Sequence, residues 1–301
     1  MAYSFDPATT SVEEELRRVA RSQIERALGT LEDPDASRDE RVHAVRKRCK
    51  KLVGLVRLVR PTFPGHDEEH AAYRAALAPL SAARDDAALD GTIDGILARF
   101  RRQVDPGAFA RVRARLAQAR PRATASEVDE ALAAAREQLA AALRRTPDWT
   151  LEEEGFAALE GGLRRGYRRA SSAMDACAHE GDAESFHRWR KRVKEHAQHA
   201  RLLRRAVGGA LDEHVVDAVT LTRDLGEHHD LFVLDGALAG VDVRGSDEVE
   251  TSIELLRGIC VGRQHALERT TLQRGEQLFD ARPSAMVKRW RNDWTGCAGR
   301  D

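Results

Sequence analysis

Two segments of the chain carry closely spaced Lys, Arg and His residues, and this chemistry suits the binding of phosphate groups. The first segment, 42–60, reads VHAVRKRCKKLVGLVRLVR, and the second, 186–204, reads FHRWRKRVKEHAQHARLLR. Guanidinium groups bind phosphate oxygens in a bidentate fashion, and lysine ammonium groups add mobile point charges. The windows 41–60 and 186–205 together hold sixteen Lys and Arg residues but a single acid, Glu195. This composition predicts an anionic partner.

The two segments are copies of each other. Aligned without gaps at an offset of 144 residues, they are identical at 8 of 19 positions. These eight identities exceed what an Ala- and Arg-rich composition yields. A weaker repeat relates residues 80–85 to residues 225–230. The repeat predicts two similar halves, 11–145 and 146–295, that join near Thr146.

On a helix with 100° per residue, each segment separates into an apolar stripe and a cationic stripe. The apolar stripe of the first copy includes Val45, Cys49 and Leu52, whereas Trp189 and His196 fall on the core side of the second copy. The cationic stripes contain His43, Arg46, Lys47, Lys50 and Arg57 in the first copy, and His187, Arg190, Lys191, Lys194 and Arg201 in the second.

A solvated helix face normally mixes charge signs, because like-charge pairs destabilise a helix by a few tenths of a kcal/mol each. Two helices that keep one sign over five turns therefore favour a bound polyanion. The alternative is that acidic side chains of neighbouring helices neutralise both stripes. His43 and His187 likewise have two interpretations, a donor to phosphate oxygen or a hydrogen-bonding group in helix packing.

The elements that position these stripes are predicted to be helices throughout. Ala, Arg, Leu and Glu dominate the sequence, and no alternating run indicates a strand. Ser11 before three glutamates marks a helix start, and Pro and Gly residues between 60 and 65 mark a helix end. Further breaks are expected at 33–34, 105–107, 120–121, 146–147, 208–209, 240–246 and 282–283. About ten helices in an all-α fold of antiparallel bundles are expected.

The composition excludes several other classes of protein. The 301 residues hold 49 basic and 49 acidic side chains, and only 5% of them are aromatic. No segment approaches the ~18 apolar residues of a membrane span, and the start of the chain does not resemble a secretion signal. The four cysteines are far apart, so we expect reduced thiols in the cytoplasm rather than disulfides or a zinc site.

No metal or catalytic site is expected from the sequence. Three histidine pairs have neighbours that could bind metal, but none brings together three convincing ligands. These pairs are His66 with His70, His196 with His199, and His228 with His229 beside Asp224 and Asp230. No phosphate-binding loop or nucleophile motif occurs, so the chain is expected to be no enzyme and to need no cofactor. Divalent ions could still bridge protein and polyanion.

These motifs resemble the CHAD family, the conserved histidine α-helical domain, over about residues 11–294. The resemblance is carried by VHAVRKRCKKL in the first half and by GLRRGYRRA, FHRWRKRVKEHAQHARLL and LGEHHDLFVL in the second. It implies two four-helix bundles related by a pseudo-two-fold, with a central basic surface that binds inorganic polyphosphate. It also implies a cytoplasmic protein, in some cases on polyphosphate granules. Besides the stripe residues, it implies contacts from Arg165, Tyr167, Arg168 and Arg169.

Two positions depart from the family pattern. Residues 81–85 lack the expected Leu-Gly turn, and Glu195 stands where the first copy has Lys51. We expect Glu195 to weaken anion contacts at one edge of the second stripe. Two other functions compete with polyphosphate binding: binding of the RNA or DNA backbone, which shares the phosphate chemistry, and metal-dependent phosphohydrolysis. The chain has no room for the triphosphatase domain that often accompanies such domains, so a standalone binding module is expected.

Overall fold

A computed structural model of the chain describes residues 3–6, 11–80, 85–100, 106–119, 123–242 and 246–298. These residues form helices and no strands, which confirms the all-α prediction. One turn of 3-10 helix, η2, interrupts the series of α-helices at Thr146–Asp148. The α-helices are α1 (Val12–Glu32), α2 (Arg38–Leu58), α3 (His66–Leu77), α4 (Asp85–Phe100), α5 (Pro106–Ala119), α6 (Ala125–Arg145), α7 (Ala157–Glu180), α8 (Ala183–Leu203), α9 (Asp212–Ala239), α10 (Asp247–Leu278) and α11 (Pro283–Ala298).

Local sequence signals fix where several helices begin. The Ser11 hydroxyl accepts a hydrogen bond from the backbone N–H of Glu14 at the start of α1, as the sequence predicts. Ser37 and Glu40 form a reciprocal capping box at the start of α2, and Asp182 caps α8. The predicted breaks at 33–34, 60–65 and 208–209 all fall between helices. Residues 81–84, where the family's Leu-Gly turn is missing from the sequence, lie outside the described residues. The predicted break at 120–121 lies outside them as well.

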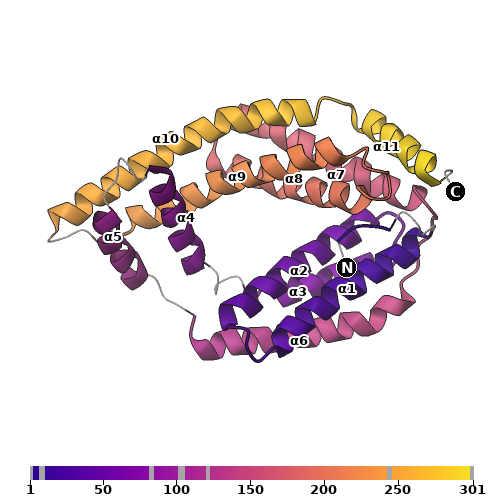
Figure 1. The fold of residues 1–301 in the computed structure, drawn as a ribbon, viewed down its shortest axis with the longest axis horizontal. Coiled ribbons are helices and arrows are strands. Elements are labelled where there is room, and N and C mark those ends of the chain that lie inside the picture. Colours follow the sequence, from indigo (N-terminus) through magenta and orange to yellow (C-terminus); the bar gives the residue numbers. More distant parts are fainter. Residues whose placement is uncertain are drawn as a thin grey trace.

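The first bundle consists of α1, α2, α3 and α6, which pack side by side (Figure 1). The predicted apolar stripe of α2 faces this core, since Val45, Cys49 and Leu52 are fully buried. In the second bundle, α7, α8, α9 and α10 pack together and α11 lies against α7. Trp189 and His196 of α8 are fully buried there, as predicted.

Helices α4 and α5 leave the first bundle and pack against the outer ends of α9 and α10 (Figure 1). Leu89, Ile93 and Phe109 share one hydrophobic cluster with residues such as Leu234 and Leu256. These two helices of the first half therefore share a hydrophobic core with helices of the second half. The division into 11–145 and 146–295 stays a prediction.

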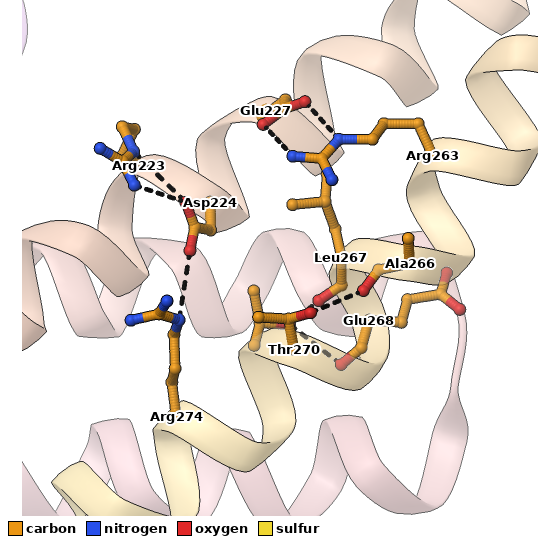
Figure 2. A network of polar contacts seen from close by, with 10 residues as sticks. Arg223, Asp224, Glu227, Arg263, Ala266, Leu267, Glu268, Thr270 and Arg274 are labelled. Carbon is orange, nitrogen blue, oxygen red and sulfur yellow. Dashed lines mark hydrogen bonds and ion pairs between the residues drawn. The ribbon is translucent and has the colours of Figure 1, made fainter.

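Ion pairs join the two long helices α9 and α10. Glu227 receives two hydrogen bonds from Arg263, at 2.6 and 2.8 Å. Asp224 lies 3.2 Å from a nitrogen of Arg223 and 3.5 Å from one of Arg274 (Figure 2). Asp224 is therefore engaged by two arginines, which satisfies a carboxylate that the sequence suggested as part of a cation site. No helix among the described residues is long and apolar enough to cross a membrane.

Candidate functional site

The two cationic helices, α2 and α8, line a common cavity of about 590 Å³. Residues of α3, α4 and α9 complete its walls. Of the nineteen described residues that line it, eight are Lys or Arg and two are acidic. The lining basic residues are Arg46, Lys50, Arg57, Arg74, Arg190, Lys191, Arg192 and Lys194.

A second cavity of about 320 Å³ adjoins the first. The two cavities share Arg46, Lys50, Lys194 and Gln198 as lining residues, so they are direct neighbours, and we call the two together the basic groove. Six of the nine described residues that line the second cavity are Lys or Arg, and none of the nine is acidic. They are Tyr3, His43, Arg46, Lys47, Lys50, Lys51, Lys194, Gln198 and Arg201.

Ten of the fourteen predicted site residues line the basic groove. Seven line the larger cavity, and His43, Lys47 and Arg201 line the smaller one. The seven are Arg46, Lys50, Arg57, His187, Arg190, Lys191 and Lys194. The amphipathic pattern of each copy thus predicts which face of α2 and α8 borders the groove.

The four predicted residues of α7 do not line either cavity of the groove. Arg165, Arg168 and Arg169 lie on the neighbouring helix, and Arg169 is near enough to Arg192 to help burial lower the pKa of that guanidinium. Tyr167 was predicted to contact the anion, and the structure shows that it is instead a core residue, only 1% exposed.

The position of Tyr167 follows from its aromatic neighbours. Its ring centroid lies 5.4 Å from that of His196 and 5.2 Å from that of Phe279, edge-on in both cases. Burial raises the pKa of Tyr167 to about 12. The basic residues around it in the sequence obscured its place on the core-facing side of α7.

Two histidine rings stack inside the groove. The ring centroids of His187 on α8 and His229 on α9 are 4.0 Å apart. Burial, together with nearby Lys191 and Arg190, lowers the pKa of His187 to about 4. Burial and the neighbouring His187 lower the pKa of His229 to about 4 as well. Both rings are therefore neutral near pH 7, and a neutral imidazole can donate one hydrogen bond to an anion.

Glu195 places a carboxylate in the lining of the larger cavity, where it forms ion pairs with two arginines. Its carboxylate lies 2.8 Å from the guanidinium of Arg57 and 3.9 Å from that of Arg192. A second nitrogen of Arg57 lies 3.1 Å from Nε2 of His70. Arg57 is thus compensated by an internal partner. That Glu195 weakens anion contacts at this edge stays a prediction.

The suggested metal pairs have other partners in the structure. His66 Nδ1 lies 2.7 Å from a carboxylate oxygen of Asp67, and its ring stacks on that of His70. His228 Nε2 lies 3.2 Å from an oxygen of Glu268. Among the described ranges of the chain, no three His, Cys, Asp or Glu side chains are grouped so that they could hold a metal ion.

Several groove residues were not predicted from the sequence. Arg192 lies in the second stripe segment but outside the predicted cationic stripe. His229 and Asp230 belong to the motif LGEHHDLFVL, and the packing of α9 against α8 places both of them in the lining of the larger cavity. Arg74 and Thr92 come from α3 and α4, where no repeat or charge pattern marks them.

Two comparisons with known proteins match the sequence and the fold of this chain. The family model of the CHAD domain matches residues 18–239. The crystal structure of the CHAD domain from the plant Ricinus communis has a similar fold, with a TM-score of 0.59 and 17% sequence identity. That similarity covers 93% of this chain and 95% of that chain. A search of curated proteins found no match.

Proposed function

Because the chain belongs to the CHAD domain family, we propose that it binds inorganic polyphosphate in the basic groove and does not cleave it. The observation that carries this proposal is that cations of both stripes, Arg46, Lys50 and Lys194, border both neighbouring cavities of the groove. A flexible polyanion can contact both stripes at once. The resemblance of the stripe motifs to CHAD domains points to the same ligand.

The physical basis is many contacts of moderate strength. Each Lys or Arg that neutralises a phosphate releases condensed counterions, so affinity is high at low salt and falls steeply as salt is added. A cleft lined by one sign of charge also concentrates the field that attracts the polymer. The acids of this neutral chain lie mainly elsewhere, for example at 13–15 and 152–154, so the polymer is directed to the groove.

We propose binding alone, without catalysis, and association with polyphosphate granules as its consequence. The stacked pair His187 and His229 is assigned to hydrogen bonding with phosphate oxygens. Divalent cations would act only by bridging the polymer to carboxylates such as Asp230. Release of orthophosphate from polyphosphate in the presence of Mg²⁺ or Mn²⁺ would contradict this part of the proposal.

The test measures polyphosphate affinity over a salt series. We expect the double variants Arg46→Ala/Lys50→Ala and Arg190→Ala/Lys194→Ala each to weaken binding sharply and to reduce the salt slope by about two, one per lost phosphate contact. A matched control is Lys288→Ala on α11, because Lys288 is exposed and lies outside the groove. Unchanged affinity in both double variants would overturn the proposal.

Binding of nucleic acid is the competing outcome. Single strands are usually held by aromatic side chains on which bases stack. Apart from histidines, the aromatic side chain among the described lining residues of the groove is Tyr3, whereas Trp189 of α8 is fully buried. We therefore expect polyphosphate to displace RNA or DNA at equal phosphate concentration. The reverse result would identify a nucleic-acid backbone as the preferred ligand.

A further inference from the structure

The sequence repeat relates two pairs of residues that carry different charges. At the offset of 144, Lys51 corresponds to Glu195, and Arg57 corresponds to Arg201. Arg57 and Glu195 form an ion pair at 2.8 Å on the side of the larger cavity. Lys51 and Arg201 line the smaller cavity together, so two cations occupy the place where the other side has a cation and an anion.

The charges around Lys51 confirm that these cations are close. Burial, and after it the positive charges of Arg48, Arg201 and Lys47, together lower the pKa of Lys51 to about 8. Glu195 has the corresponding arginines near it, Arg57 and Arg192. Glu195 attracts Arg57 and Arg192. Lys51, at the equivalent position, repels the equivalent arginines Arg201 and Arg48.

The start of the described chain holds Lys51 in this position. The hydroxyl of Tyr3 donates a hydrogen bond of 2.9 Å to the backbone oxygen of Lys51, and Nζ of Lys51 lies 4.7 Å from the centre of the Tyr3 ring. The N–H of Phe5 donates to the backbone oxygen of Leu202 at 2.8 Å, and the Phe5 side chain is buried. A cation held over an aromatic ring is oriented without being neutralised.

We propose that Lys51 and Arg201 form a distinct phosphate subsite in the smaller cavity, and that polyphosphate is held more tightly at this end of the groove than at the Glu195 end. The proposal rests on the proposed function. Two cations that lack an acidic neighbour among the described lining residues gain most when a phosphate lies between them. At the other end, Glu195 already occupies the equivalent place beside Arg57, so a phosphate would have to approach a carboxylate.

The test compares Lys51→Gln and Arg201→Gln with the exposed cations Lys288→Gln and Arg269→Gln as matched controls. The probes are a long polyphosphate and tripolyphosphate, each measured over a salt series. We expect either groove variant to weaken both probes about tenfold at low salt and to reduce the salt slope by about one. Lys51→Arg should keep the affinity, because it keeps the charge. Far-ultraviolet circular dichroism and thermal melting show that each variant is folded.

A gain of affinity is expected at the opposite end. Glu195→Gln removes the carboxylate that compensates Arg57, so it should strengthen polyphosphate binding several-fold. If Lys51→Gln and Arg201→Gln bind both probes like the two controls, the subsite is absent although the proposed function stands. If the unmodified protein binds neither probe at low salt, the proposed function itself fails.

Discussion

Gly54 of α2 and Gln198 of α8 face each other where the two cavities of the groove join: a Cβ atom built on Gly54 would lie 2.4 Å from Oε1 of Gln198. The two positions are equivalent in the sequence repeat. Nε2 of His199 also donates a 3.0 Å hydrogen bond to the backbone oxygen of Gly54. The close approach of the two helices brings their cationic stripes onto one groove.

A different glycine allows α2 and α7 to approach each other closely. A Cβ atom on Gly162 would lie 1.6 Å from the backbone oxygen of Leu58, and a backbone atom cannot rotate away. We therefore predict that Gly162→Ala destabilises the protein by about 3 kcal/mol, in the upper range for overpacked sites. Chemical denaturation monitored by circular dichroism measures this change.

Gly54→Ala is the matched control for that variant. Here the obstructing atom is the end of the flexible Gln198 side chain, which can turn aside, and alanine favours the helix over glycine by about 1 kcal/mol. The free energy of unfolding should change by less than about 1 kcal/mol. Equal losses of stability in both variants would show that the contact of Gly162 with Leu58 does not limit the packing.

The buried carboxylate of Glu69 provides a second stability prediction. Glu69 is 2% exposed and accepts two hydrogen bonds from Arg145, at 2.6 and 3.1 Å, which join α3 to α6. Glu69→Ala removes the partner of a partly buried guanidinium, although Glu68 at 3.3 Å can take its place in part. The expected destabilisation is about 2 kcal/mol, below the range for a fully buried pair.

Arg145→Ala should have a larger effect than Glu69→Ala. Arg145→Ala leaves the carboxylate of Glu69 buried without its cation. In Glu69→Ala, by contrast, the guanidinium of Arg145 still has Glu68 and solvent as partners. Thermal melting of the two variants and of the double variant gives the coupling between the residues. Additive effects of the two substitutions would contradict the pairing.

The helices and their core faces were predictable because both are local properties of the sequence. The buried stripe of α2 and the interior positions of Trp189 and His196 follow from a period of 3.6 residues. The same period predicts the cationic faces of α2 and α8 that line the groove. The Pro and Gly residues of the local sequence also locate the breaks at 60–65 and 208–209.

Features that depend on tertiary contacts were not predictable in the same way. The ion pair between Arg57 and Glu195 joins residues 138 positions apart, and the stack of His187 on His229 joins α8 to α9. Tyr167 was assigned to the anion site because four arginines surround it in the sequence, yet the single ring faces the core. A charge pattern describes the exposed face of a helix and says little about one aromatic side chain within it.

A hydrogen-bonded pair of histidines, the fully buried His196 and the half-buried His214, predicts loss of stability in acid. Nε2 of His196 lies 2.7 Å from Nε2 of His214, so the two neutral rings share one proton in a hydrogen bond. Burial lowers the pKa of His196 far below its usual value and that of His214 to about 4. The unfolded chain therefore binds more protons between about pH 6.5 and pH 4, and the free energy of unfolding falls as the pH falls through this range.

Thermal melting as a function of pH tests this prediction. The double variant His196→Leu/His214→Leu removes both rings together, so it leaves no unpaired hydrogen-bonding group and should melt with a weaker pH dependence than the unmodified protein. The control is His179→Leu near the end of α7, where the histidine is exposed. An unchanged pH dependence in the double variant would assign the acid sensitivity to other groups.

The histidine stack in the groove predicts that polyphosphate binding takes up protons. His187 and His229 each have a pKa of about 4 because burial and the surrounding cations Arg190 and Lys191 disfavour the imidazolium. A bound polyanion adds negative charge beside the rings, which raises their pKa. Glu184 near His187 acts in the same direction, and His228 near His229 acts in the opposite one.

The sign of the effect follows from this shift. A ligand that raises the pKa of a group binds more tightly as the pH falls through the range between the free and bound values. Polyphosphate affinity should therefore increase as the pH falls from neutral toward about 4, the pKa of both rings in the free protein, and the increase should disappear in His187→Asn/His229→Asn, which keeps polar side chains without titrating there. Calorimetry in buffers of different ionisation enthalpy counts the protons directly. An increase of affinity in acid that persists in the double variant, with the same proton uptake, would place the titrating group outside the stack.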